Sequence, residues 1–85
     1  MKQAKLDVLL ERKRQIEEEG WLPEDDDHYT DNELVKAAVC YALGTASDIT
    51  WPWSLKCWKP KDKRRNLVRA AALLIAEIER LDRIQ

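Results

Sequence analysis

The sequence contains few of the residues that build metal centres and catalytic triads. Its 85 residues include one histidine, two cysteines and two glycines, and phenylalanine is absent. With His28 alone, neither a histidine-based zinc site nor a serine triad can be assembled within one chain. Cys40 and Cys57 stand far apart without a partner motif, which argues against a disulfide framework or a zinc site. We therefore expect a protein that is not an enzyme and that holds no metal and no cofactor.

The sequence also lacks a long hydrophobic run and a net charge of either sign. No apolar stretch approaches the roughly 18 residues of a transmembrane helix, and Met1 leads directly into a charged amphipathic stretch, so we expect no signal peptide. The formal net charge is −1, which predicts no strong overall attraction to nucleic acids or membranes. We expect a single domain over residues 1–85, located in the cytoplasm, with neither a membrane nor a nucleic acid as partner.

The charges are nevertheless segregated along the chain. Residues 17–33 carry nine acids and no lysine or arginine, whereas residues 56–69 carry seven cations against one acid, Asp62. Two blocks of opposite sign attract each other, either within one chain or between two chains. The acidic block includes residues 24–28, which lack the spacing and the turn glycine of an EF-hand loop, so we expect no cation site there.

Two helices are predicted in the first half of the chain. Residues 3–19 carry apolar side chains at helical spacing, and Gly20 is a suitable end. Thr30 and Glu33 have the S/T-x-x-E spacing of a capping box, so the second helix begins at Thr30 or the next residue and ends at Gly44. This second helix is apolar most of the way round, which predicts that it is the central and most buried one. The apolar positions of the first helix are Leu6, Leu9, Leu10 and Ile16.

A third helix is predicted over residues 62–82, where the apolar residues form one stripe at helical spacing. Small residues in the second and third helices allow these two helices to approach closely. The sequence thus predicts an all-α fold, a small three-helix domain with a long, ordered loop rich in tryptophan and proline between the second and third helices. The stripe on the third helix consists of Leu67, Ala71, Leu74, Ile75, Ile78 and Leu81.

The loop over residues 45–61 holds the most distinctive segment, with three tryptophans and two prolines in residues 51–60 and cations directly after it. Indole rings stack on planar groups, and neighbouring lysines and arginines bind phosphates, so the segment is suited to a flat anionic ligand. The same tryptophans are equally suited to form a lid on the hydrophobic core, since each buries a large area. The candidate ligand-binding residues are Trp21, Trp53, Trp58, Lys59, Arg64 and Arg65.

Four segments in this order resemble a set of short phage and prophage proteins. The resemblance implies a phage-encoded accessory protein, which would act in the cytoplasm of the host cell, and it implies no established chemistry. Gly20-Trp21 followed by Pro23 and paired aspartates is also similar to the start of the ryanodine-receptor repeat domain, a small helical module. The four segments are residues 11–16 (ERKRQI), 19–27 (EGWLPEDDD), 51–60 (WPWSLKCWKP) and 65–83 (RNLVRAAALLIAEIERLDR).

Two hypotheses of function stay open. In the first, the protein sequesters an anionic, nucleotide-like small molecule, such as a signal of a host defence system. In the second, it docks on a host or phage protein through exposed tryptophan and arginine residues, which are favoured interface anchors. Glu79 and Asp82 match the second carboxylate pair of all-helical nucleotide pyrophosphatases, but no E-x-x-E pair precedes them at a suitable distance. Because a chain of this length has a small core, we also expect a homo-oligomer.

Overall fold

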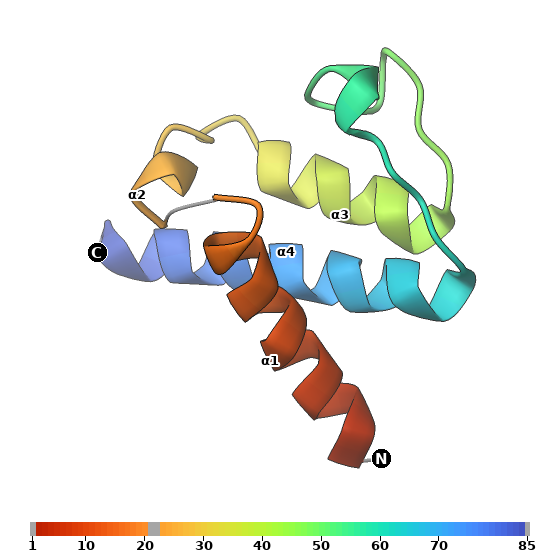
Figure 1. Ribbon diagram of the computed structural model, residues 1–85. Coiled ribbons are helices and arrows are strands. Elements are labelled where there is room, and N and C mark those ends of the chain that lie inside the picture. The colour runs from red at the N-terminus through yellow and green to blue at the C-terminus, as the bar shows by residue number, and fades with distance from the viewer. Residues whose placement is uncertain (1, 21–22, 85) are drawn as a thin grey trace.

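The protein is all-α in its computed structural model, which describes residues 2–20 and 23–84 (Figure 1). This confirms the predicted fold class, and no strand occurs among the described residues. The three predicted helices are present, and the structure adds a short helix before the second one and a 3-10 turn in the loop. None of the described helices is long and apolar enough to cross a membrane. The elements are α1 (Lys2–Glu17), α2 (Pro23–Asp26), α3 (Glu33–Leu43), the 3-10 helix η1 (Leu55–Cys57) and α4 (Lys63–Arg83).

The centre of the fold is α4, which contacts α1, α2 and α3. Helix α3 runs antiparallel along one side of α4, and α1 crosses α4 at a steep angle (Figure 1). The prediction that the second helix would be the central one is therefore wrong. Helix α3 buries only one face, and Val39 and Leu43 on its other face are exposed. An apolar composition therefore did not mean burial on all sides.

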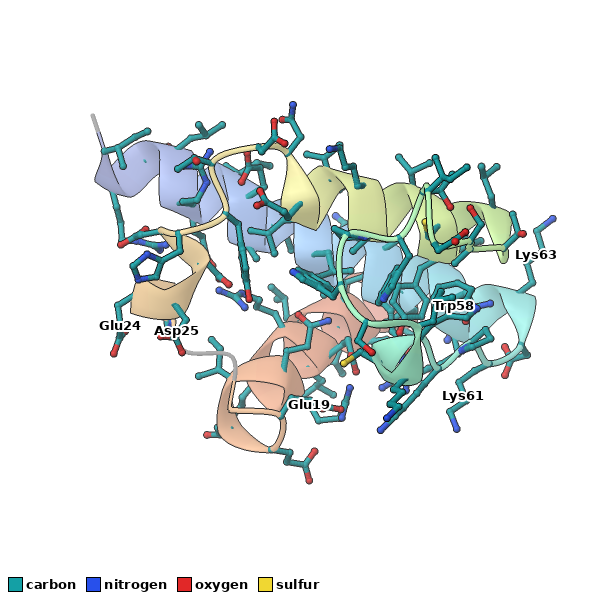
Figure 2. All side chains as sticks on the ribbon, turned by 90° about the horizontal axis from the view of Figure 1, so that it is seen from above. Glu19, Glu24, Asp25, Trp58, Lys61 and Lys63 are labelled. Atoms are coloured by element: carbon teal, nitrogen blue, oxygen red, sulfur yellow. The ribbon has the colours of Figure 1, made fainter. Side chains whose placement is uncertain are left out.

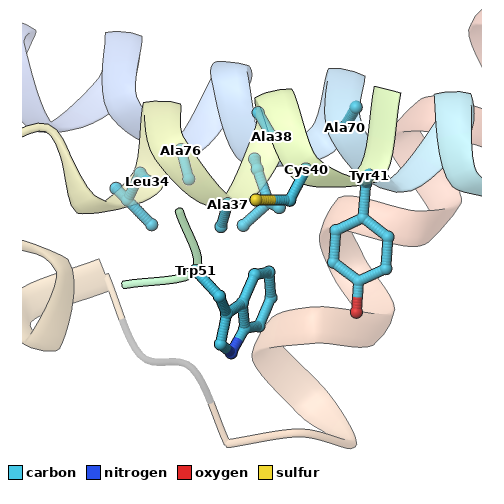
Figure 3. Close-up of a cluster of buried hydrophobic side chains, with 9 residues drawn as sticks. Leu34, Ala37, Ala38, Cys40, Tyr41, Trp51, Ala70 and Ala76 are labelled. Atoms are coloured by element: carbon cyan, nitrogen blue, oxygen red, sulfur yellow. The ribbon is translucent and has the colours of Figure 1, made fainter. Parts of the chain in front are cut away.

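The hydrophobic core lies between α3 and α4, and four of its nine buried residues are alanines. Ala37 and Ala38 of α3 face Ala70 and Ala76 of α4, and small side chains let two helix backbones approach closely (Figure 3). Leucine and aromatic side chains close this core. Its other buried members are Leu34, Cys40, Tyr41, Trp51 and Leu73.

Helix α1, in contrast, docks on the rest of the protein through a polar face. Arg12 is buried and donates hydrogen bonds to Asp26 of α2 at 3.3 Å and to Glu79 of α4 at 3.0 Å. Burial raises the pKa of Asp26 even though Arg12 lies beside it. Glu11 and Gln15 are also buried on this face. The leucines of α1, Leu6, Leu9 and Leu10, are exposed.

The apolar stripe of α4 lies mostly in solvent as well. An amphipathic helix normally turns such a stripe toward the core. The buried side of α4 lies one position along and mixes alanines and polar residues, such as Ala70, Asn66 and Glu77, with the apolar Val68 and Leu73. The exposed members of the stripe are Leu67, Leu74, Ile78 and Leu81.

The start of α3 differs from the predicted capping box. The helix begins at Glu33, and its N-cap residue is Asn32, which has a left-handed backbone (φ 61°) and makes no side-chain cap hydrogen bond. Glu33 Oε1 accepts a hydrogen bond from the Asp31 backbone N–H at 2.7 Å. Only the carboxylate half of the predicted motif is present, and it is displaced by one residue from Thr30. The predicted end at Gly44 is confirmed, with φ 75° and hydrogen bonds from its N–H to Cys40 O and Tyr41 O.

Candidate functional site

The loop after α3 folds back onto the core through Trp51. Its side chain is 4% exposed, and its indole N–H donates a hydrogen bond to the Ser54 carbonyl at 3.0 Å. The ring lies against Tyr41 of α3, with centroids 5.6 Å apart (Figure 3). Trp51 is therefore part of the core, as one of the two interpretations of this segment predicts.

The other two tryptophans of the loop pack on either side of Trp51 and are half-buried. Trp58 lies 4.7 Å from the ring of Tyr41 and 5.1 Å from that of Trp51. Trp53 lies 5.4 Å from the ring of Trp51 and 5.3 Å from that of Tyr29, which precedes α3 in the chain. These contacts keep the two indoles apart on different sides of the aromatic cluster. The fourth candidate ring, Trp21, lies outside the described residues.

The loop is joined to α4 by the side chain of Asn66. Its carbonyl oxygen accepts a hydrogen bond from the backbone N–H of Lys61 at 2.7 Å, and its amide nitrogen donates one to the carbonyl of Lys61 at 3.0 Å. One residue later, Asp62 is the N-cap of α4 and accepts from the Arg65 N–H at 3.0 Å. These bonds place the cationic residues before α4 at a defined position beside α1.

Two of the predicted ligand-binding cations are paired with acids of α1. Arg64 lies 2.9 Å from Asp7, and Arg65 donates a hydrogen bond to the buried carboxylate of Glu11. A side-chain hydrogen bond from Gln3, followed by one from Arg64, lowers the pKa of Asp7. The two guanidinium groups thus help to hold α1 against α4.

The structure does not bring the predicted site residues into one pocket. Trp53 borders a hollow that also contains Asp25 and Asp26, and Arg64 borders a shallow groove between α1 and α4. Of the five candidates that the structure describes, Lys59 alone lines the pocket described next. The centre of the acidic block lies far from the basic block, since Glu24 and Asp25 are at one end of the molecule and Lys61 and Lys63 at the other (Figure 2), whereas Glu19 borders the same pocket as Lys61.

No ion pair joins the two charge blocks within the described part of the chain. The acids pair instead with arginines and a lysine outside the basic block, as in Arg12 with Asp26, Arg83 with Asp27 and Arg14 with Glu19. The sequence predicted attraction between the two blocks, within one chain or between two chains. Among the described residues of one chain, this attraction takes no form of a direct ion pair.

A pocket of about 220 Å³ opens between the C-terminal half of α1, η1 and the segment that leads into α4. We call it the α1–η1 pocket. Helix α1 forms one wall, the residues around η1 form the opposite wall, and side chains of α3 and α4 lie between them. Its lining residues are Glu11, Arg14, Gln15, Glu19, Tyr41, Lys56, Cys57, Lys59, Lys61 and Arg69.

The lining of the α1–η1 pocket is strongly cationic. Five lysines and arginines face two carboxylates, which leaves an excess of three positive charges in a protein whose net charge is −1. Both carboxylates are already engaged by Arg14, which bonds Glu11 and Glu19 at 2.8 Å. Burial on its own raises the pKa of Glu11, but the hydrogen bond from Arg14 and the charges of Arg14, Arg65 and Arg69 outweigh it and hold this pKa below its ordinary value. Glu11 is thus ionised and internally neutralised at neutral pH.

Two buried polar atoms of lining residues have no hydrogen-bond partner among the residues that the structure describes. Gln15 is 1% exposed; its amide N–H group donates to Glu11 at 3.2 Å, while its Oε1 accepts no hydrogen bond. The Nε of Arg69 is the second such atom. The Arg69 guanidinium lies 5.8 Å from the centre of the Tyr41 ring and donates from Nη1 to the Lys59 carbonyl at 2.7 Å. Unpaired buried groups of this kind are rare and costly in proteins.

Sequence analysis missed most of this pocket. Arg14 and Gln15 lie in an ordinary charged helix, and their spacing from Glu11 indicates only a local helix-face interaction. Arg69 and Lys56 belong to the basic block, but no motif separates them from Arg64 and Arg65. The one available signal was the polar pair Glu11 and Gln15 at i, i+4, on the helix side opposite to the leucines.

The described residues contain no group of three or more histidine, cysteine, aspartate or glutamate side chains placed to hold a metal ion. Of the two cysteines, Cys40 is buried in the core and Cys57 is exposed at the edge of the α1–η1 pocket.

No known protein family, characterised protein or solved structure compared with this chain shows significant similarity to it. The geometry of the pocket therefore carries the functional inference by itself.

Proposed function

We propose that this protein binds a small anionic, nucleotide-like molecule in the α1–η1 pocket. The observation that carries the proposal is the excess of three positive charges around two unpartnered buried polar atoms, Gln15 Oε1 and Arg69 Nε. An N–H of arginine donates to a phosphate oxygen, and an amide oxygen accepts from a hydroxyl. A phosphate next to a sugar hydroxyl would satisfy both atoms.

The size of the pocket limits how much of the ligand it encloses. Pockets for drug-sized molecules measure about 300–1,000 Å³, and this one measures about 220 Å³. It therefore suits the phosphate and the sugar of a nucleotide, with the base resting outside near η1. In the phage setting that the sequence resemblance implies, such a protein would sequester a signal of host defence and would not transform it.

The alternative, docking on a protein through exposed tryptophans and arginines, receives less support. Trp51 is buried, Trp53 and Trp58 are packed on other rings, and Arg64 and Arg65 are paired with α1. Side chains that are already held by neighbours have less contact area to offer a partner.

The proposal is tested by calorimetric titration with nucleoside monophosphates, cyclic nucleotides, a nucleoside and inorganic phosphate. Phosphate-bearing compounds should bind, and the nucleoside should not. Lys59→Gln and Lys61→Gln should each weaken binding about ten- to a hundredfold, because a hydrogen bond to a charged group contributes about 1.5–3 kcal/mol.

Lys63→Gln is the matched control. Lys63 is an exposed cation two residues after Lys61 but does not line the pocket, so its removal should leave affinity within about twofold. Equal losses in all three variants would indicate general charge attraction. The proposal is contradicted if millimolar phosphate compounds give no heat of binding in the titration and do not change the melting temperature of the protein.

A further inference from the structure

The apolar face that α4 leaves in solvent has the spacing of a coiled-coil seam. Leu67, Ala71, Leu74, Ile78 and Leu81 follow one another at steps of four, three, four and three residues, which is the a/d pattern of a heptad repeat. We propose that this outer seam packs against the outer seam of a second copy of the chain, with the two α4 helices antiparallel. The proposal does not depend on the ligand.

The other faces of α4 are already occupied. Ala70, Leu73 and Ala76 pack in the core with α3, while Arg65 and Glu79 bond α1. The four large residues of the outer seam are between 40% and 58% exposed. Helix α4 is thus covered on two faces, by α3 and by α1, and its third face is apolar and exposed. We expect this third face to be buried by association with another chain.

Helix α1 extends the uncovered surface. Leu6, Leu9 and Leu10 are 48–61% exposed, and the apolar hollow of about 450 Å³ where α1 meets α4 is lined by Ala4, Lys5, Val8, Leu9 and Ile75. Because α1 docks through Glu11, Arg12 and Gln15, its leucines have no core of their own. A partner helix on the outer seam would reach the side of α1 and cover part of these leucines.

The surface area of the subunit supports this assignment. A folded monomer of 10.0 kDa exposes about 5,200 Å², whereas this chain exposes 5828 Å². The excess of about 600 Å² is close to the ~800 Å² that each partner buries in a standard interface. The subunit thus carries nearly one interface more surface than a monomer of its size.

The antiparallel orientation follows from the symmetry of the seam. Leu67 and Leu81 are each seven residues from Leu74, so a twofold axis at Leu74 places Leu67 against Leu81 of the partner subunit. Charge favours the same orientation, because Lys61 and Lys63 lie at one end of the molecule and Glu24 and Asp25 at the other (Figure 2). Antiparallel packing brings opposite charges together, and parallel packing would bring like charges together.

Sedimentation or light scattering at 10–200 µM tests the association. The wild type should show a mass near 20 kDa, and Leu74→Glu should return it to 10.0 kDa with an unchanged helical circular dichroism spectrum, because Leu74 is 43% exposed in the subunit. Leu43→Glu is the control. It places the same charge on α3, at a residue that is 72% exposed, and should leave the mass near 20 kDa.

Cysteine cross-linking tests the orientation. In a Cys57→Ser background, an oxidised mixture of Leu67→Cys and Leu81→Cys chains should form a mixed disulfide dimer, and Leu67→Cys alone should form little. The reverse pattern overturns the antiparallel arrangement. A mass of 10 kDa for the wild type throughout the concentration range, or dissociation by Leu43→Glu instead of Leu74→Glu, overturns the interface.

Discussion

Arg65 of α4 donates a hydrogen bond to Glu11 of α1, whose carboxylate is fully buried between the two helices. This contact is the most direct link between segments that lie 54 residues apart. It also changes the role of Arg65. The side chain does not line the α1–η1 pocket but holds Glu11, which does, so replacing Arg65 should lower stability and reach the pocket only through Glu11.

Glu11→Gln should therefore lower the free energy of unfolding by about 1.5–3 kcal/mol at pH 7, the usual contribution of a hydrogen bond to a charged group, because Arg14 and Arg65 are partly exposed and stay solvated. Arg14 and Arg65 would lose their common partner. Chemical denaturation measured by circular dichroism checks the value. Lys13→Gln on the exposed side of α1 is the control and should change stability by less than about 0.5 kcal/mol.

The pH dependence of stability should carry the signature of the same residue. The pKa of Glu11 in the folded protein lies below its ordinary value of 4.5, so its contribution is complete above pH 4.5 and is lost as pH falls through the lower, folded pKa. The raised pKa of Asp26 acts in the opposite direction, because the folded state takes up that proton more readily. The difference between wild type and Glu11→Gln isolates Glu11. This difference should shrink on acidification, and a constant difference from pH 7 to pH 3 would contradict the assignment.

Replacing Trp51 should destabilise the protein more than replacing Trp58. Trp51→Ala removes a buried ring and its hydrogen bond to Ser54, at a cost of about 3–5 kcal/mol, out of a total of about 4–13 kcal/mol for a chain of this length. Trp58→Ala removes a half-buried ring and should cost clearly less. Thermal melts of the two variants and of Trp58→Phe, which keeps an aromatic ring against Tyr41, check this order. Equal melting temperatures for Trp51→Ala and Trp58→Ala would show that the burial of Trp51 is misassigned.

Asn66→Ala should lower the stability of the protein and also release the backbone of Lys61, a cationic residue that lines the pocket. It leaves the N–H and the carbonyl of Lys61 without their partners, which costs about 1–3 kcal/mol. Asp62→Ala, which removes only the N-cap of α4, should cost about 1 kcal/mol. If Lys61 contacts the ligand, Asn66→Ala should weaken binding more than Asp62→Ala at a temperature where both variants are folded. The opposite order would remove Lys61 from the site.

Backbone conformation at the two ends of α3 gives a matched pair of changes. Gly44 has φ 75°, and a Cβ there would meet nothing closer than 3.9 Å, so Gly44→Ala should cost about 1–2 kcal/mol from the left-handed conformation alone. Asn32 has φ 61° and makes no side-chain cap, so Asn32→Gly should be neutral or slightly stabilising. Urea unfolding measures both. A loss at Asn32→Gly as large as that at Gly44→Ala would show that the Asn32 side chain has a role of its own.

Local patterns in the sequence predicted the elements of the fold better than their packing. The sequence pattern placed the long helices within three residues of their observed ends, with the largest error at the start of α3, and Gly44 marked the end of α3 correctly. Periodicity shows that a helix has an apolar side, but it does not show what that side faces. In α4 the stripe through Leu74 is exposed, and the buried face one residue along has only Val68 and Leu73 as large apolar residues among alanines and polar side chains, so its hydrophobic periodicity is weak.

The candidate site was harder to predict for a related reason. Sequence proximity grouped Trp53, Lys59 and Arg64, yet these three side chains border three different hollows of the surface. The observed pocket combines Gln15 with Arg69, more than fifty residues apart, and their approach depends on how α1 crosses α4. That crossing is set by the ion pairs of Arg12 and Arg65, which follow from no local motif.

The polar attachment of α1 has a consequence for the order in which the protein opens. Helices α3 and α4 are joined by apolar contacts that salt strengthens, whereas α1 is held chiefly by ion pairs that salt screens. Amide hydrogens of α1 should therefore exchange with solvent through a separate, partial unfolding event that becomes more frequent at high ionic strength. Amide hydrogens of α3 and α4 should exchange only through global unfolding. Since α1 forms one wall of the α1–η1 pocket, each such opening also removes that wall while α3 and α4 stay folded.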